Sequence, residues 1–200
     1  MGMTRVTADH SISLDGFTAG PDQSHDEPLG VRGEELHTWM FEAADDHAAE
    51  REAILEASAY VMGRNMFAGP GEWDPAWRGW WGEEPPYHGP VFVVTHQERD
   101  ALPMDGGTTF HFVNGGIEEA LDRATEAAGD GSVSIAGGAQ TLRQYLAAGL
   151  VDELRLHVSP VVLGAGERLF DGLAGVTFEP IAVRHHPLAS HLTYRVGRAT

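Results

Sequence analysis

The sequence predicts an α/β fold built on a mostly parallel sheet. Residues 133–170 hold a short apolar run, a Gly-Gly pair, an amphipathic segment and a second apolar run, an order typical of a strand, a turn, a helix and a strand. Earlier in the chain, strand and helix patterns also alternate, whereas the C-terminal part has strand patterns alone. Because parallel strands need crossover connections, this order predicts a parallel sheet with an antiparallel C-terminal edge.

The individual elements follow from local patterns. Strands are expected at 6–14, 59–62, 91–95, 109–113, 133–136 and 151–160, and a closing antiparallel pair at 177–184 and 191–196. Helices are expected at 34–57, with a break near Asp45 and Asp46, at 117–128 and at 139–148. Since the chain has no repeat, linker or shift in composition, its 200 residues fit a single domain over 1–200.

The composition argues against several classes of protein. A net charge of −17 disfavours a nucleic-acid partner, because phosphate backbones are bound by basic patches. The chain has no cysteine, which excludes disulfides and thiolate metal sites. No apolar run approaches the roughly 20 residues of a membrane span, and the N-terminal residues lack the apolar core of a signal peptide. We therefore expect a cytoplasmic protein with no membrane partner.

The 11 histidines raise the question of a metal site. His157, His185, His186 and His191 come nearest to a cluster, but no recognised ligand spacing accompanies them. No metal is therefore expected. A serine hydrolase is also unsupported, because the GxSxG nucleophile elbow is missing.

A long segment without helix or strand periodicity runs from Phe67 to Pro90. It holds four of the five tryptophans of the chain. Loops of this length are commonly functional or disordered, and the tryptophans argue against disorder. The segment is expected to be either a lid that stacks on a flat heterocycle or a second small core.

Six short motifs carry a resemblance to a known family. In chain order they are SLDGF at 13–17, VMGRNMF at 61–67, VFVVTH at 91–96, IAGGAQTLRQYL at 135–146, GLVDELRL at 149–156 and LGAGERLF at 163–170. Together they resemble the dihydrofolate-reductase-like superfamily, and within it the branch of the C-terminal reductase domain of the bifunctional riboflavin-biosynthesis deaminase-reductase. The resemblance implies a central, mostly parallel eight-stranded sheet with helices on both faces, NADPH as the cofactor, and a homodimer.

The resemblance also implies a cofactor site at strand ends, which is where open parallel sheets bind ligands. Gly63 and Arg64 match the family's Gly-Arg pair, whose arginine faces the adenosine 2′-phosphate. A guanidinium meets a phosphate with two parallel hydrogen bonds; alternatively, Arg64 pairs with one of the 30 acidic residues. The other expected cofactor-binding residues are Asn65, Met66, Thr95, His96, Gly137, Gly138, Ala139 and Gln140.

The loop after the first strand covers the nicotinamide in the relatives, which assigns Leu14 and Gly16 to cofactor binding. Asp15 between them either orients the substrate or the nicotinamide carboxamide, or begins a turn before glycine. Glu35 lies roughly where folate reductases carry the acid that holds the pterin, and is either that acid or a solvated helix charge. Asp9 and His10 on the first strand either face the pocket, or His10 is a histidine whose hydrogen bonds are satisfied within the strand.

The function expected from these features is an NADPH-dependent reductase that transfers a hydride to a small heterocyclic or carbonyl substrate. Two other classes stay open: a nucleotide-binding module without turnover, and a ligand-binding protein that uses the tryptophan-rich segment. Arg64 together with Gly137 and Gly138 favours cofactor binding over the last of these. No basic cluster for a ribose phosphate accompanies them, so the sequence does not name the substrate.

Overall fold

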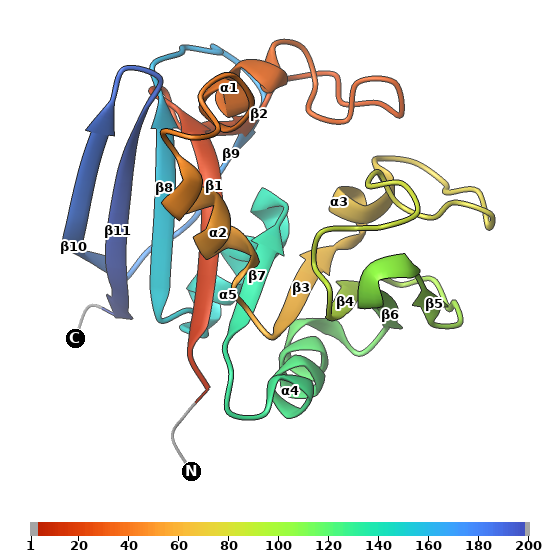
Figure 1. The fold of residues 1–200 in the computed structure, drawn as a ribbon. Helices are drawn as coiled ribbons and strands as arrows, with labels where there is room; N and C mark the ends of the chain where they lie inside the picture. Colours follow the sequence, from red (N-terminus) through yellow and green to blue (C-terminus); the bar gives the residue numbers. More distant parts are fainter. Residues whose placement is uncertain (1–3, 199–200) are drawn as a thin grey trace.

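The computed structural model describes residues 4–198, which form a twisted sheet with helices against both faces (Figure 1). The strands are β1 (Val6–Ser13), β2 (Phe17–Ala19), β3 (Ala59–Gly63), β4 (Pro90–Val94), β5 (Leu102–Pro103), β6 (Thr109–Val113), β7 (Val133–Gly137), β8 (Glu153–Ser159), β9 (Glu167–Arg168), β10 (Val176–His186) and β11 (Ala189–Arg198). The helices are η1 (Gly33–His37), α1 (Thr38–Glu42), α2 (Ala48–Leu55), α3 (Arg64–Ala68), η2 (Asp105–Gly107), α4 (Gly116–Ala128) and α5 (Ala139–Ala148), where η marks a 3₁₀ turn.

The main sheet has the strand order β10-β11-β8-β1-β7-β3-β4-β6-β5. The six strands from β8 to β6 are parallel, and β11 and β10 continue the sheet in antiparallel pairing. This confirms a mostly parallel sheet with an antiparallel C-terminal edge. The sheet has nine strands in place of the expected eight, because the two-residue β5 adds an antiparallel strand beside β6.

The longer elements lie close to their predicted positions. Strand β6 and helix α5 have the predicted bounds, and the segment expected to be helical from residue 34 is interrupted between α1 and α2, at residues 43–47. The pair formed by β2 and β9 was not predicted. Strands of two or three residues are too short to produce a periodic pattern, which explains why β2, β5 and β9 escape a sequence-based prediction.

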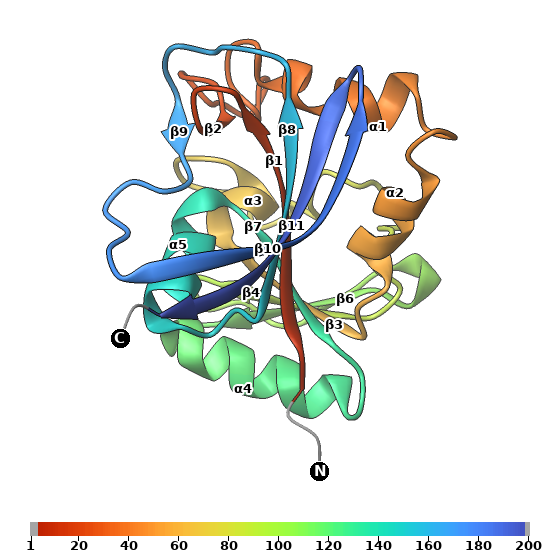
Figure 2. The same ribbon diagram turned by 90° about the vertical axis from the view of Figure 1, so that its left-hand side faces the viewer.

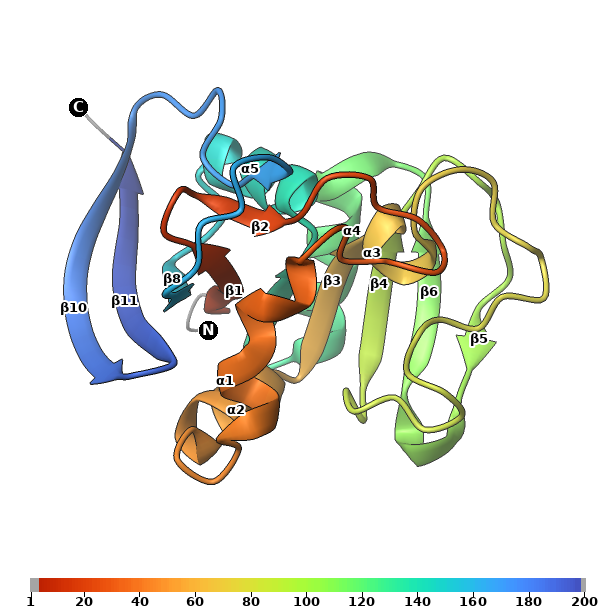
Figure 3. The same ribbon diagram turned by 90° about the horizontal axis from the view of Figure 1, so that it is seen from above.

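Helices α4 and α5 cover one face of the sheet, while η1, α1 and α2 lie against the other (Figures 2 and 3). Helix α4 turns Ala120, Leu121, Ala124 and Ala128 into the core, a spacing that gives one apolar face. The same core contains the central parts of β1, β7 and β8. Within residues 4–198, no helix combines the length and the apolar character that crossing a bilayer requires.

The tryptophan-rich segment covers the part of the sheet that α1 and α2 do not reach. Trp73, Trp77 and Trp81 are partly buried against a second cluster that includes Phe67 and Phe110. The indole N–H of Trp77 donates to the carbonyl oxygen of Phe67 (2.8 Å). The segment therefore forms a second core, which was one of its two predicted roles.

Packing against β1 and β11 makes Leu154 of β8 a sensitive position, since its side chain is fully buried. We expect Leu154→Ala to lower the free energy of unfolding by about 2–5 kcal/mol, because it leaves a cavity between well-packed strands. Leu14→Ala is the matched control: its side chain is 63% exposed, and the expected change is within about 0.5 kcal/mol. Urea unfolding measures both, and equal effects would contradict the assigned core.

Candidate functional site

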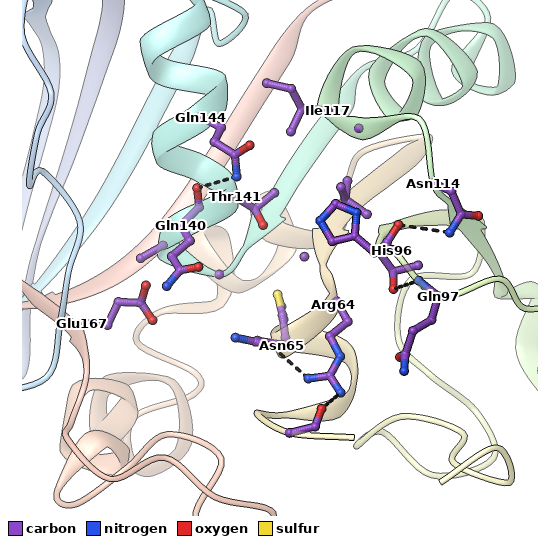
Figure 4. A pocket seen from close by; sticks show the side chains of 18 residues that line it. Arg64, Asn65, His96, Gln97, Asn114, Ile117, Gln140, Thr141, Gln144 and Glu167 are labelled. Atoms are coloured by element: carbon purple, nitrogen blue, oxygen red, sulfur yellow. Dashed lines mark hydrogen bonds between the residues drawn. The ribbon is translucent and has the colours of Figure 1, made fainter. Parts of the chain in front are cut away.

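The principal cleft lies at the carboxyl ends of β3, β4, β6 and β7 and has a volume of about 420 Å³ (Figure 4). Parallel strands end at the same edge of a sheet, so residues far apart in the sequence meet there. The expected cofactor-binding residues that line the cleft are Gly63, Arg64, Asn65, Met66, Thr95, His96, Gly138, Ala139 and Gln140. The structure therefore brings these residues together in one cleft, and their binding of a cofactor stays a prediction.

Two glycines allow close packing at the strand ends: Gly63 beneath the first turn of α5, and Gly137 beside β1. Gly137 has a φ of +122°, and a Cβ there would lie 2.7 Å from Cε1 of His10. At Gly63, a Cβ would lie 2.1 Å from the hydroxyl oxygen of Thr141. Gly137 thus supports the turn from behind and is not among the lining residues. Gly138 differs: a Cβ there would meet no described atom within 4 Å, so its missing side chain leaves open space beside the cleft.

Arg64 begins α3 directly after β3. Its guanidinium donates to the carbonyl oxygens of Gly69 and Gly71 and to Oδ1 of Asn65, and its Cζ lies 5.5 Å from the ring centroid of Trp73. Among residues 4–198 its partners are therefore neutral oxygens, and the alternative of an ion pair with an acidic residue is wrong. A guanidinium whose charge no carboxylate neutralises is suited to an anion.

Helix α5 adds backbone donors to the same cleft. Its first hydrogen bond runs from the N–H of Leu142 to the carbonyl oxygen of Gly138 (3.0 Å), so the N–H groups of residues 139–141 have no acceptor within the helix. These groups and the helix dipole place partial positive charge at the turn. Together with Arg64, they make the cleft attractive to phosphate although the chain as a whole is acidic.

The opposite wall is fixed by polar contacts after β4 and β6. The Thr95 hydroxyl accepts the N–H of Gln97 (3.1 Å), and the Asn114 side chain donates to the carbonyl oxygen of Thr95 (3.2 Å). His96 lies between these groups and the α5 side of the cleft (Figure 4). This wall offers polar edges and a ring at the position expected beside an adenosine.

A second cavity, of about 470 Å³, adjoins the cleft. The two share five lining residues: Asn65, Met66, Gly138, Ala139 and Glu167. The rest of the second cavity comes from β1, from Ala136 of β7, from residues between 18 and 41, and from Trp80 and Trp81. The tryptophan-rich segment therefore also lines a cavity, and two compartments with a common wall can hold two ligands in contact.

Buried histidines and one buried carboxyl group set the polarity of the second cavity. Burial lowers the pKa of His37 to about 4 and also lowers the pKa of His10, so both are neutral near pH 7. The side chain of Asp9 is only 5% exposed, and neither of its oxygens has a hydrogen-bond partner among the described residues. Its nearest cationic neighbour is Arg155, with Nε 3.5 Å from Oδ1. Asp9 and His10 both line the cavity, which is the first of the two alternatives for this pair.

Asp15 has a different setting from the one expected for a substrate-orienting group. Its carboxylate accepts the Ser13 hydroxyl (2.7 Å) and the N–H groups of Leu163 (3.1 Å) and Gly164 (2.7 Å). These donors, the Ser13 hydroxyl first, lower the pKa of Asp15 to about 2. Leu14, Asp15 and Gly16 line neither cavity. The carboxylate is used to hold a turn, so the geometry supports the turn interpretation of Asp15.

Glu35 also lies outside both cavities. Its two oxygens accept Nε and Nη2 of Arg32 (2.7 and 2.9 Å), and this pair lowers the pKa of Glu35. The chain forms a 3₁₀ turn here in place of the expected helix start, and His37 and Phe41 are the residues from this stretch that face the cavity. The expected acid of the first helix is therefore an exposed partner of Arg32, and the buried acid is Asp9.

Several lining residues were not anticipated. They are Gly71, Val94, Gln97, Asn114, Gly116, Ile117, Thr141, Gln144 and Glu167 in the cleft. Asn114 and Gly116 directly follow β6, a predicted parallel strand, so the rule that ligands lie at carboxyl ends would have found them. Glu167 comes from β9, which gave no sequence signal.

The fold is that of the dihydrofolate-reductase-like reductases. Dihydrofolate reductase from Enterococcus faecalis, solved with NADP(H), superposes with a TM-score of 0.57 and 17% identity over 97% of both chains. The chain belongs to the RibD C-terminal domain family, whose model matches residues 4–193.

The chain is also similar to two proteins named for riboflavin biosynthesis or its reductase and to one uncharacterized protein. A putative riboflavin biosynthesis protein from Shewanella sp. PV-4 has a TM-score of 0.63 and 21% identity, with 98% of this chain and 100% of that chain covered. The diaminohydroxyphosphoribosylaminopyrimidine deaminase/5-amino-6-(5-phosphoribosylamino)uracil reductase from Thermotoga maritima has a TM-score of 0.62 and 17% identity, over 96% of this chain and 56% of that longer one. The uncharacterized protein YyaP from Bacillus subtilis (strain 168) is 24% identical over 172 residues, 83% of this chain and 80% of YyaP.

The donors around Asp15 predict a pH-dependent contribution to stability. Because its pKa is lowered from 3.8 to about 2 in the folded protein, the stabilisation is present above about pH 4 and is lost as the pH falls toward 2. The difference in melting temperature between the native protein and Asp15→Asn should therefore be constant above pH 5 and shrink below pH 4. Asp26→Asn, at an exposed site, is the control; a pH-independent Asp15→Asn difference would contradict the assignment.

Proposed function

We propose that this protein is an NADPH-dependent reductase that transfers a hydride to a small heterocyclic or carbonyl substrate. The observation that carries the proposal is the pair of adjoining cavities with a common wall at Asn65, Met66 and Gly138. One cavity has the donors for an anionic ligand, and the other is lined by aromatic rings around a buried carboxyl group. Membership of the RibD C-terminal domain family and the fold shared with reductases support this proposal.

NADPH fits the first cavity in its chemistry. Arg64 would meet the 2′-phosphate, the N–H groups of residues 139–141 the pyrophosphate, and Thr95 and His96 the adenosine. The open space at Gly138 leaves room for the phosphates beside the turn. When bound there, NADPH supplies the hydride, and the protein positions the two ligands and excludes water between them.

The second cavity suits a flat ring. Phe41, Trp80 and Trp81 offer aromatic faces and edges, and such rings pack well on planar heterocycles. The indole N–H of Trp80 donates to the carbonyl oxygen of Met66 (3.0 Å), which fixes the ring at the wall common to both cavities. The homodimer stays a prediction, for which solution scattering is the direct measurement.

Thermal unfolding in the presence of NADPH or NADH tests whether NADPH is the cofactor. NADPH should stabilise the protein more than NADH, because only NADPH has the 2′-phosphate, and a ligand at 100 times its Kd adds about 2.7 kcal/mol. Arg64→Ala should remove most of the difference between the melting-temperature shifts that NADPH and NADH produce. Arg51→Ala, at an exposed site on α2, is the matched control and should behave like the native protein.

Gly138→Val gives a second arm of the same test. Gly138 has a φ of −71°, a value that side chains tolerate, so the variant is expected to stay folded and to lose the NADPH-dependent shift. Equal stabilisation by NADPH and NADH, or none by either, would refute the proposed cofactor.

Turnover is measured as the loss of NADPH absorbance when a candidate substrate is added. The candidates are pterins, pyrimidine precursors of riboflavin and simple carbonyl compounds. Trp80→Ala should raise KM for a flat substrate by about tenfold, since stacking of aromatic rings contributes about 0.5–1.5 kcal/mol beyond burial. Phe178→Ala on β10 is the control, because Phe178 lines neither cavity and should leave KM unchanged. Binding of NADPH without turnover of any compound would favour the non-catalytic module.

A further inference from the structure

Four imidazole rings lie in a row beside the start of α2. His186 Nδ1 lies 3.1 Å from His47 Nε2, and His47 Nδ1 lies 2.8 Å from His191 Nε2. Further in, His191 Nδ1 lies 2.8 Å from His157 Nδ1, and His157 Nε2 lies 3.7 Å from Oδ1 of Asp9. The rings come from the turn before α2 and from β8, β10 and β11, so only the tertiary fold brings them together.

Three residues of this region direct ligand atoms at one point. His47 and Glu50 come from the start of α2 and His191 comes from β11, and their ligand atoms lie within 4.8 Å of one another. Both histidines are buried, and the side chain of Glu50 is 15% exposed. Two imidazoles and a carboxylate are a ligand set that Zn²⁺ takes in proteins, with water in the fourth position.

A cation of the chain itself lies at this point. Nη2 of Arg184 lies 2.9 Å from Nδ1 of His47 and 2.6 Å from Oε2 of Glu50, so the point attracts positive charge. The side chain of Arg184 is 42% exposed, and its guanidinium can turn out to solvent. A cavity of about 230 Å³ borders Glu50, Arg184 and His191, which gives space for a metal ion and its water.

Trp39 holds the two candidate ligand rings in place. Its ring centroid lies 5.4 Å from that of His47 and 5.1 Å from that of His191. Its indole N–H donates to the hydroxyl oxygen of Ser11 (3.1 Å) and does not compete for the imidazole nitrogens. Rings that are already fixed lose little freedom when they bind an ion.

The tautomer of His47 is set by contacts on the side away from Arg184. The backbone N–H of Leu188 donates to Nδ1 of His186 (3.3 Å), so this nitrogen is an acceptor and the facing Nε2 of His47 must carry the hydrogen. Burial lowers the pKa of His47, which keeps the ring neutral near pH 7. Its Nδ1 therefore has a lone pair aimed at the point where the ligand atoms meet.

With Arg184 as the cation, the inner end of the row has two acceptors face to face. Nε2 of His191 must then donate to Nδ1 of His47, so Nδ1 of His191 accepts from Nδ1 of His157. A neutral His157 then presents a bare Nε2 to the carboxylate of Asp9. Neither this nitrogen nor either oxygen of Asp9 has a hydrogen-bond partner among the described residues, and the two side chains are only 3% and 5% exposed.

A metal ion in place of the guanidinium reverses these hydrogens. Nε2 of His191 gives its lone pair to the ion, so the hydrogen of this ring is on Nδ1 and is donated to Nδ1 of His157. His157 then carries its hydrogen on Nε2, directed at the carboxylate of Asp9. Metal-bound imidazoles commonly have such outer partners, which fix the tautomer and make the ligand more basic. The contact with Asp9 thus changes from two acceptors to a donor and an acceptor.

We propose that His47, Glu50 and His191 bind a divalent metal ion of the Zn²⁺ type, with Arg184 turned aside. The ion ties the start of α2 to β11, and the neighbouring imidazoles support the two ligand rings from behind. The proposal does not depend on the reductase function. It departs from the sequence-based expectation of no metal, because His47 and His191 are 144 residues apart and no local spacing announces them.

A protonated His157 is the competing explanation of the inner contact. An imidazolium there would donate to both His191 and Asp9 without any metal ion. Arg155 already places a positive charge beside this carboxylate, with Nε 3.5 Å from Oδ1 of Asp9, and a second cation nearby is disfavoured by the first. The two explanations differ at His191, whose hydrogen is on Nε2 beside an imidazolium and on Nδ1 with a metal ion.

Titration of the untagged protein with Zn²⁺ after treatment with EDTA tests the site. We expect one Zn²⁺ per chain, bound at micromolar concentration or tighter, and a rise in melting temperature. Because loss of an outer partner of a ligand already lowers metal affinity about 10–100-fold, His191→Ala should weaken binding at least about 100-fold. His185→Ala, at an exposed site on the same hairpin, is the matched control and should bind like the native protein.

Arg184→Gln distinguishes this site from incidental binding. The variant removes a cation that competes for Glu50, so Zn²⁺ should bind about tenfold more tightly, the effect of one like charge close to the ion. Arg195→Gln, which removes the exposed pair with Glu179 on the same hairpin, should leave the affinity unchanged. Because Arg184 is exposed, this variant stays informative if His191→Ala does not fold.

Ring ¹⁵N NMR at neutral pH locates the hydrogens with Zn²⁺ and with EDTA. Zn²⁺ should leave the hydrogen of His47 on Nε2, move that of His191 from Nε2 to Nδ1, and move that of His157 from Nδ1 to Nε2. This pattern is specific to the proposed ligands, because a metal ion bound elsewhere on the surface would change none of the three rings.

Four results would overturn the proposal. They are no binding of Zn²⁺ up to millimolar concentration, equal binding by the native protein and a folded His191→Ala, unchanged affinity in Arg184→Gln, and hydrogen on Nε2 of His191 at saturating Zn²⁺. The last result, with hydrogen on both nitrogens of His157, would establish the imidazolium instead.

Discussion

The close approach of α5 to the ends of β3 and β7 is the constraint on which the rest of the site depends. At the end of β3 it exists because Gly63 has no side chain, so that Thr141 of α5 occupies the space where a Cβ would stand. At the end of β7, Gly137 leaves the same kind of space for His10 of β1. This contact aims the donors of the first turn of α5 into the cleft and fixes Gly138 at the wall between the two cavities. A bulkier residue at either glycine would move the turn, and with it both compartments.

Around that contact, charge is distributed unevenly in a chain with a net charge of −17. In the cleft, Arg64 is held by neutral oxygens and keeps its charge available. In the second cavity, burial keeps His10 and His37 neutral. The cleft thus carries an available cation, whereas the second cavity is lined by neutral imidazoles and aromatic rings.

The sequence was sufficient for the fold class and for most of the cleft, because both depend on local patterns. A parallel strand, a glycine turn and an amphipathic helix are visible in consecutive residues, and the carboxyl-end rule then assembles Arg64, Thr95 and Gly138. Asp15 and Glu35 show where this approach fails. The turn that Asp15 holds depends on Leu163 and Gly164, about 150 residues away, which no local pattern records. Glu35 pairs with Arg32 only three residues away, and there the prediction fails because the chain forms a 3₁₀ turn in place of the expected helix.

A chain of contacts between four imidazole rings, those of His186, His47, His191 and His157, lies beyond sequence-based prediction for the same reason. His47 precedes α2 and its partners lie on β8, β10 and β11, so no ligand-like spacing announces them. The histidines seen as a weak cluster in the sequence, His185 and His186, diverge in the structure: His186 joins the chain, and His185 is exposed and bonds to Ser190.

The edge strand β10 has a consequence for how copies of this protein can meet. Its outer side is an open row of backbone groups, a surface that invites another strand to extend the sheet. Pro180 lacks an N–H, and the pairing with β11 slips in register between Pro180 and Ala182, so the ladder is interrupted in the middle of the strand. Continuous sheet extension is thereby discouraged, and association at this end would have to use side-chain surfaces, such as the exposed Ile181 and Val183.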